Sequence, residues 1–191
     1  MSSNKDSQVI VVGGGHAGVE AALVSARMGV HTLLVTGLKD AIARMPCNPS
    51  IGGLAKSHLV YELDALGGEM GINADLTALQ EKTLNTSRGP AVQATRAQCD
   101  KRLYSRRMQE VVARQANLEV VEGAATGIVV EDGRAKGVVV DVGGSSRTVL
   151  ADAVVVTAGT SLRGRIFVGM EEMPSGGDGR PAVDQIGRAH V

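Results

Sequence analysis

The topology of this chain follows from residues 8–18, which read Gln-Val-Ile-Val-Val-Gly-Gly-Gly-His-Ala-Gly. A short β-branched run ends in glycines, and apolar residues then recur at helical spacing over residues 17–28 until Gly29. A second apolar run at residues 31–35 has the length of a buried parallel strand. The three segments predict a strand, a helix and a second strand, which is the opening unit of a Rossmann-like parallel sheet.

The glycines between the first strand and the helix fit the pattern G-x-G-x-x-G. In a dinucleotide-binding turn, Gly13 makes the tight bend, Gly15 lets the backbone approach a pyrophosphate, and Gly18 lets helix and strand pack closely. The negative pyrophosphate then lies at the positive end of the helix dipole. The cofactor-binding candidates in this turn are Gly13, Gly14, Gly15, His16, Ala17 and Gly18.

The acidic residue that usually holds the cofactor ribose about twenty positions further on is missing. The second apolar run ends in Thr36 instead, and Glu20 comes too early and lies in the predicted helix. This absence weakens the interpretation as a simple NAD dehydrogenase. It leaves Thr36 or a backbone group to contact the ribose.

A small antiparallel sheet is predicted over about residues 124–150. Short apolar runs at 128–130, 137–142 and 148–150 are separated by Asp-Gly and Gly-Gly turns. The strand predicted at 153–156 then leads into Thr157, Ala158 and Gly159, which we take as further cofactor contacts. A Rossmann half with such a meander resembles the FAD-binding domain of flavoproteins that have two dinucleotide domains, which favours FAD over NAD.

The composition argues against several other classes of protein, such as membrane proteins and disulfide-bonded secreted proteins. The 191 residues carry 20 basic and 20 acidic side chains, so the molecule has no overall field for polyanions. Apolar runs are far shorter than the ~20 residues of a membrane helix, and the first residues lack a targeting core. Two cysteines make no disulfide framework, and the histidines lack ligand spacing, so we expect a cytoplasmic protein without a metal.

Three further elements are predicted before the meander: a helix at 56–66, a long helix at 95–115 and a strand at 118–121. The first helix has an apolar face made of Leu59, Val60, Leu63 and Leu66. Basic residues outnumber acidic ones by seven to two over 88–114, and most are expected to lie off the apolar stripe of the long helix. They fit either contacts to nucleic-acid phosphates or a solvated helix face.

Cys47 lies in the segment Met45-Pro-Cys-Asn-Pro-Ser-Ile-Gly-Gly53. Prolines and glycines hold this loop just ahead of a predicted helix, whose dipole favours a thiolate. The alternative is a small buried side chain in a turn. The loop has a single cysteine, and Cys99 is placed in the long helix as a packing residue, so a dithiol mechanism within this chain is not expected.

Several motifs occur together in one order: residues 9–22, 47–53, 64–68, 84–92 and 94–98. Together they resemble the glucose-inhibited division protein A family, the tRNA uridine 5-carboxymethylaminomethyl modification enzymes. The resemblance implies an FAD enzyme that works with a GTPase partner on the wobble uridine of tRNA, using NADH and methylenetetrahydrofolate, and that forms a homodimer. It also implies that Cys47 is a catalytic residue and that the backbone of Ala125 contacts the adenine side of FAD.

Family members are more than three times as long as this chain. We therefore expect an α/β, Rossmann-like FAD-binding domain over residues 1–185 that is incomplete at its C-terminus. Residues 186–191 match one reading frame of a sequencing-library adapter, and we expect them to be a non-native tail. The alternatives are an FAD- and folate-dependent tRNA uracil methyltransferase, another FAD oxidoreductase, or a catalytically incompetent FAD-binding fragment.

Overall fold

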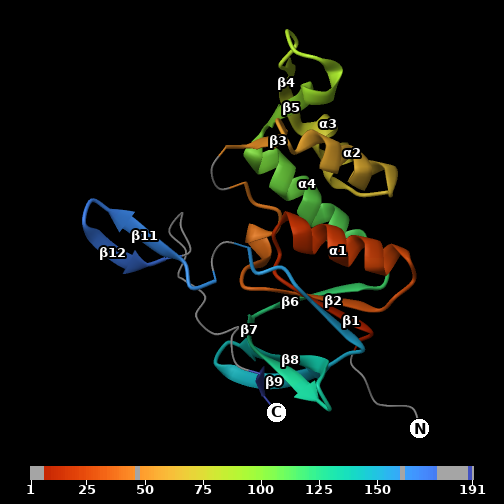
Figure 1. Cartoon of the computed structure of the whole chain (residues 1–191). Coiled ribbons are helices and arrows are strands. Elements are labelled where there is room, and N and C mark those ends of the chain that lie inside the picture. The colour runs from red at the N-terminus through yellow and green to blue at the C-terminus, as the bar shows by residue number, and fades with distance from the viewer. Residues whose placement is uncertain (1–6, 46–47, 160–161, 176–188, 191) are drawn as a thin grey trace.

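A four-stranded parallel sheet lies at the centre of the molecule (Figure 1). The computed structural model describes residues 7–45, 48–159, 162–175 and 189–190. The strand order is β10-β1-β2-β6, and each neighbouring pair is parallel. Its strands are β1 (Val9–Val12), β2 (Thr32–Thr36), β6 (Leu118–Glu122) and β10 (Ala153–Val156). The predicted Rossmann-like sheet is confirmed.

Alternating side chains of β1 and β2 enter two different cores. Val11 and Leu34 pack with the helices α1 (His16–Arg27) and α4 (Lys101–Arg114) on one face. Ile10, Val12 and Val35 face the opposite way and pack against the meander. Figure 1 shows the helices and the meander on opposite sides of the sheet. A strand that is buried on both faces must be apolar throughout, which explains the continuous Val-Ile-Val-Val run.

The meander forms as predicted. Its strands pair antiparallel in the order β7-β8-β9, and Val138, Val140 and Val149 point into the core beneath the parallel sheet. Asp132 and Gly133 have φ angles of 50° and 71°, the left-handed conformation that a tight hairpin turn requires. The strands are β7 (Ala124–Glu131), β8 (Arg134–Val142) and β9 (Ser145–Leu150).

A second α/β unit is inserted between β2 and α4 and lies beyond α4 in Figure 1. Its antiparallel sheet has the order β3-β5-β4. Ile51, Ala74 and Ala97 from this unit belong to the same buried cluster as Val11 and Leu34, so the core is continuous. The elements are η1 (Lys39–Ala41), β3 (Ser50–Gly52), α2 (Ser57–Ala65), α3 (Met70–Thr77), β4 (Ala78–Leu84), η2 (Pro90–Val92) and β5 (Ala94–Cys99).

The predicted helix at 95–115 is wrong over its first residues. Residues 94–99 form β5, which pairs with β3 on one side and β4 on the other. The alanine and arginine residues of this segment have helical propensity, but two neighbouring strands supply the backbone partners that decide its conformation. The helix begins at Lys101 because Asp100 caps it, accepting hydrogen bonds from the backbone N–H groups of Arg102 and Leu103 at 2.9 Å each.

The apolar face predicted for the helix at 56–66 is only partly buried. The helix itself is present as α2, but Leu59 is 57% exposed and Leu66 is 81% exposed. Gly68 brings the chain back against Leu63 at the end of this helix. The helix α3 and the strands β3 and β4 were not predicted. Residues 70–84 follow neither a helical nor a strand period, and β3 is only three residues long, too short to show a period.

Two short pairings complete the described chain. β11 (Arg165–Val168) and β12 (Glu171–Pro174) form an antiparallel hairpin, seen apart from the sheets in Figure 1. β13 (Ala189–His190) pairs in parallel with β7. The origin of residues 186–191 stays a prediction. Within the described residues, every helix is too short or too polar to cross a membrane.

Candidate functional site

The glycine turn after β1 is held between the two neighbouring strands. The backbone N–H of Gly13 donates to the carbonyl of Val35 at 2.8 Å, which joins the turn to β2. Thr157, directly after β10, donates its backbone N–H to the carbonyl of Val12 at 2.8 Å. Its hydroxyl is 2.8 Å from the Val12 carbonyl oxygen and 3.1 Å from that of Gly13. Thr157 therefore fastens the turn from the opposite edge of β1.

Two of the glycines are required by space. A Cβ on Gly18 would lie 1.8 Å from the carbonyl oxygen of Gly13 and 2.6 Å from Thr157 Oγ1. Gly13 has a φ of 111°, and its Cβ would lie 2.4 Å from the Thr157 carbonyl oxygen. Gly15 differs, because no atom of the described residues lies within 4 Å of the position that its Cβ would take. The turn is thus tightly packed at Gly13 and Gly18, whereas there is free space next to Gly15.

The open side is the N-terminus of α1, and it suits an anion. Gly15 is the N-cap; no side chain caps this end of the helix, and its first turn has no acidic residue. The first N–H groups of a helix have no partner within the helix and carry the positive end of its dipole. A pyrophosphate fits here because a side chain at position 15 would fill the space above the turn.

Thr36 lies against this turn, as its assignment to the ribose requires. It is buried at the end of β2, and a Cβ on Gly14 would come within 2.5 Å of its Oγ1. The Thr36 hydroxyl donates to the carbonyl of Leu38 at 3.3 Å and keeps lone pairs for accepting. Ala43 donates its N–H to the Gly14 carbonyl at 2.9 Å, so the next loop also packs on the turn.

The remaining predicted contacts fall in different places. Ala158 and Gly159 follow Thr157 at the end of β10, with Gly159 at a φ of 62°. Ala125 is the second residue of β7 rather than a residue before the meander, and it is buried beneath Val12 and Val35. Its contact with adenine stays a prediction. Cys47 lies outside the described residues.

A group of buried polar side chains lies on the inner side of α1. The rings of His16 and Tyr104 meet edge to face with centroids 5.6 Å apart. His16 Nδ1, Glu20 Oε1 and the Tyr104 hydroxyl are buried without a hydrogen-bond partner among the described residues. Burial lowers the pKa of His16 and raises that of Glu20, whose other carboxylate oxygen accepts from the Glu69 N–H at 3.0 Å. The sequence placed His16 in the turn but gave no sign of Tyr104.

We expect the free energy of unfolding to fall as the pH drops below 6.5, in part because of His16. Burial lowers the pKa of His16 in the folded protein, so the unfolded chain binds a proton more readily. Stability is therefore full above the ordinary value of 6.5 and decreases towards the lower, folded-state pKa. Urea unfolding of His16→Asn at pH 5 to 7 measures this. A dependence as steep as that of the unchanged chain would contradict it.

An ion-pair network that the sequence did not indicate joins three helical segments. Glu69 is buried and accepts from Arg27 at 2.6 Å and from Arg107 at 3.0 Å. Arg107 also reaches Asn73 Oδ1 at 3.1 Å. Residues 27, 69 and 107 are about forty positions apart, a distance over which no local pattern reports pairing. Arg107 fits neither use suggested for the basic segment, because its guanidinium pairs with Glu69 and Asn73 inside the fold.

Metal-ligand geometry does not occur in the part of the chain that the structure describes: no three His, Cys, Asp or Glu side chains there are grouped to hold an ion. The glycine turn around Gly15 is the candidate site for a nucleotide. Thr157 packs against one side of the turn, and Gly13 and Gly18 are closely packed beneath it. The uncapped N-terminus of α1 is the side that a ligand can approach.

Comparisons with known proteins agree with this geometry. The family model "Glucose inhibited division protein A" matches residues 8–189. Two curated relatives, both named tRNA uridine 5-carboxymethylaminomethyl modification enzyme MnmG, are from Geobacter sulfurreducens (56% identical over 90% of this chain) and Geobacter metallireducens (54% over 91%). The chain spans 27% of the length of each.

A solved structure of Aquifex aeolicus GidA superposes with a TM-score of 0.88 at 44% identity, covering 95% of this chain and 30% of that one. The agreement therefore includes the sequence, the order of elements and their arrangement in space. The chain belongs to the glucose-inhibited division protein A family.

Proposed function

We propose that this chain is the FAD-binding part of an enzyme that modifies the wobble uridine of tRNA at C5, adding a carboxymethylaminomethyl-type group. The observation that carries the proposal is the glycine turn, closed by Thr157 and open above Gly15 at an uncapped helix N-terminus. The two curated relatives named for this modification supply the reaction class.

Each part of the turn has a defined task in this proposal. The N–H groups at the start of α1 hold the pyrophosphate, and Thr36 contacts the ribose. Thr157 keeps Gly13 in the conformation that lets the cofactor approach, with Ala158 and Gly159 beside it. Ala125 contacts the adenine side through its backbone. FAD, when bound, supplies two-electron redox chemistry, which this chain's own side chains do not provide.

The residue proposed to act on the tRNA is Cys47, as a nucleophile towards the uracil ring. Methylenetetrahydrofolate as the carbon source, NADH as the source of electrons, a GTPase partner, a homodimeric assembly and a cytoplasmic location belong to the same proposal. A non-catalytic FAD-binding module is the second candidate, because the chain spans only 27% of its curated relatives. The segment 47–53 favours the first candidate over a uracil methyltransferase.

Two measurements test the proposal separately. Titrating FAD into the 191-residue chain, followed by flavin fluorescence, tests the binding site. Mass spectrometry of nucleosides from tRNA of a strain that lacks the complete gene tests the reaction. Unchanged wobble uridines in that strain would refute the modification, whereas FAD binding with unchanged nucleosides would leave only the binding module.

A further inference from the structure

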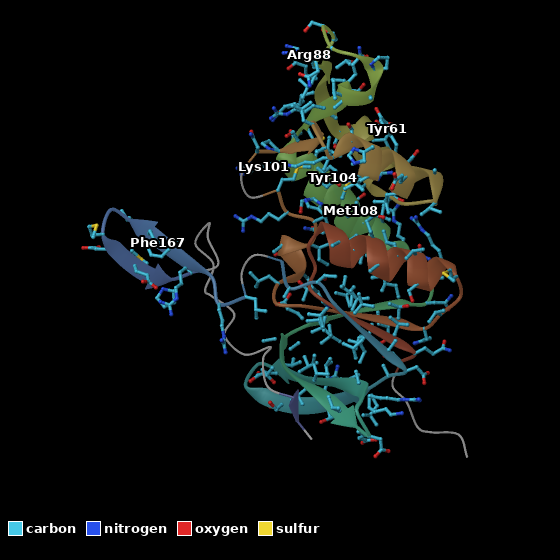
Figure 2. All side chains as sticks on the ribbon, viewed as in Figure 1. Tyr61, Arg88, Lys101, Tyr104, Met108 and Phe167 are labelled. Atoms are coloured by element: carbon cyan, nitrogen blue, oxygen red, sulfur yellow. The ribbon has the colours of Figure 1, made fainter. Side chains whose placement is uncertain are left out.

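The structure divides the basic segment of residues 88–114 into three parts. Arg88 lies near the tip of the β4–β5 loop, away from Lys101 at the start of α4 (Figure 2). Arg107 turns inward to Glu69. Lys101, Arg102 and Arg106 lie together along one groove at the N-terminal part of α4. Three of the seven basic residues of this segment thus line one groove, whereas Arg96 lies in β5 and Arg114 at the end of α4.

This basic groove has a volume of about 500 Å³. Its lining contains four cationic side chains and one carboxylate, that of Asp40. All four cations are exposed at the surface, where a large ligand in solvent can reach them. Arg106 also forms an ion pair with Glu110 on the same helix, with 3.6 Å between Nε and Oε1. The lining residues are Asp40, Arg44, Met45, Lys101, Arg102, Ser105, Arg106 and Gln109.

The floor of the groove is fixed by hydrogen bonds between α4 and the loop after β2. The Ser105 hydroxyl donates to the carbonyl of Ile42 at 2.7 Å. Gln109 Nε2 donates to the Asp40 carbonyl at 3.0 Å and to Ser105 Oγ at 3.1 Å. The cationic side chains therefore project from a rigid base, which reduces the entropy lost when they bind a ligand.

The groove is connected to the cofactor turn by residues 43–45. Ala43 donates its N–H to Gly14 of the turn, and Arg44 and Met45 follow it directly into the groove lining. Met45 is the last described residue before Cys47. A ligand in this groove lies beside Met45, which is two positions before the proposed nucleophile in the sequence.

The side chains that line the groove indicate which class of ligand it can bind. A protein partner would require an apolar interface core, and Met45 is the only apolar side chain here. A small free anion would require buried, converging donors, whereas these cations are exposed and spaced along the groove. No aromatic side chain lines it, so base stacking is absent. What remains is a chain of phosphates contacted without reading of the bases.

We propose that the groove of Arg44, Lys101, Arg102 and Arg106 binds the phosphodiester backbone of the substrate RNA. This assignment rests on the proposed function and adds to it the surface of this chain that the RNA contacts. Each contact between a cation and a phosphate releases counterions, so the groove contributes affinity that decreases steeply with salt.

The test is the charge-reversed variant K101E/R102E in the 191-residue chain. Both positions are exposed in the first turn of α4, where acidic residues favour the helix, so the fold is expected to persist, as circular dichroism will show. The matched control is R134E/R147E, which changes the net charge equally on the meander. Fluorescence anisotropy with a labelled anticodon stem-loop that has uridine at the wobble position measures binding from 50 to 200 mM salt.

We expect K101E/R102E to weaken RNA binding about tenfold or more at 50 mM salt. We also expect it to lower the slope of log K against log salt by about 1.4 to 1.8, while the control keeps the slope of the unchanged chain. Equal losses in both variants, no loss in K101E/R102E, or no binding by the unchanged chain would overturn the assignment. So would displacement of the RNA by polyglutamate at equal charge, which would point to an acidic protein.

A separate titration keeps this inference apart from the proposed function. K101E/R102E is expected to bind FAD as the unchanged chain does, because the pyrophosphate lies at α1. A parallel loss of FAD binding would assign the groove to the dinucleotide and overturn the RNA site. Failure of the proposed function would be detected in two other experiments. Flavin fluorescence would not change when FAD is titrated into the unchanged chain, or the wobble nucleosides would be unchanged in the deletion strain.

Discussion

Replacing Gly18 with alanine is expected to unfold the nucleotide turn and abolish FAD binding. The added Cβ would lie 1.8 Å from the Gly13 carbonyl oxygen and 2.6 Å from Thr157 Oγ1. The nearest of these is backbone, so α1 must move away from β1, and both elements line the central core. Overpacking of this kind costs about 3 kcal/mol or more in the free energy of unfolding, which urea denaturation measures.

The matched control is Gly15→Ala, three positions earlier. Nothing lies within 4 Å of its Cβ, and the backbone there is ordinary for any residue. We expect the free energy of unfolding to change by less than about 1 kcal/mol. Binding of FAD should nevertheless weaken about tenfold or more, because the methyl group takes the space of the pyrophosphate. Equal stability of Gly18→Ala and the unchanged chain would contradict the packing role of Gly18.

Replacing Cys47 with alanine in the complete protein is expected to reduce wobble-uridine modification about a thousandfold or more while FAD stays bound. Loss of a nucleophile removes the covalent route altogether, and the remaining binding groups rescue little of the rate. The cofactor turn is built from other segments, which is why flavin binding should survive. Nucleoside mass spectrometry and the flavin absorbance of the purified variant provide the two readouts.

Cys99→Ala is the control for the loss of a thiol. Cys99 is 1% exposed at the end of β5, and its Sγ lies 3.9 Å from the Ala74 carbonyl oxygen and 3.8 Å from that of Ala97. Burial raises the pKa of this thiol, which disfavours the reactive thiolate. We expect a stability loss of about 1 kcal/mol and unchanged modification. Full activity in Cys47→Ala would reduce Cys47 to a structural residue.

The sequence predicted the parts of the molecule whose patterns are local. The turn at Gly13 and Gly18 was found because a β-branched run and a helical period flank the glycines within one short stretch. The meander was found because its turns need residues such as Gly133 that tolerate positive φ. Thr36 and Thr157 were placed beside the turn because Thr36 ends one strand of the parallel sheet and Thr157 directly follows another.

Features that depend on distant partners were missed. The segment 94–99 has helical composition and became a strand because β3 and β4 lie on either side of it. Glu69 meets Arg27 and Arg107 only after three helical segments have packed. Tyr104 could have been marked by its place on the apolar stripe of the long helix, but its contact with His16 had no sequence signal.

The hydrogen bonds of Thr157 to the glycine turn determine when this turn can be completed during synthesis of the chain. Its hydroxyl bonds to Val12 across 145 positions of the chain. At about 5 to 20 residues per second, a ribosome needs roughly 7 to 29 s to make the residues that separate them. During that interval β1 lacks its neighbouring strand β10, and Gly13 lacks its contacts with Thr157. Capture of a nucleotide is therefore a late event in the biogenesis of this domain, after nearly all of the described residues have been made.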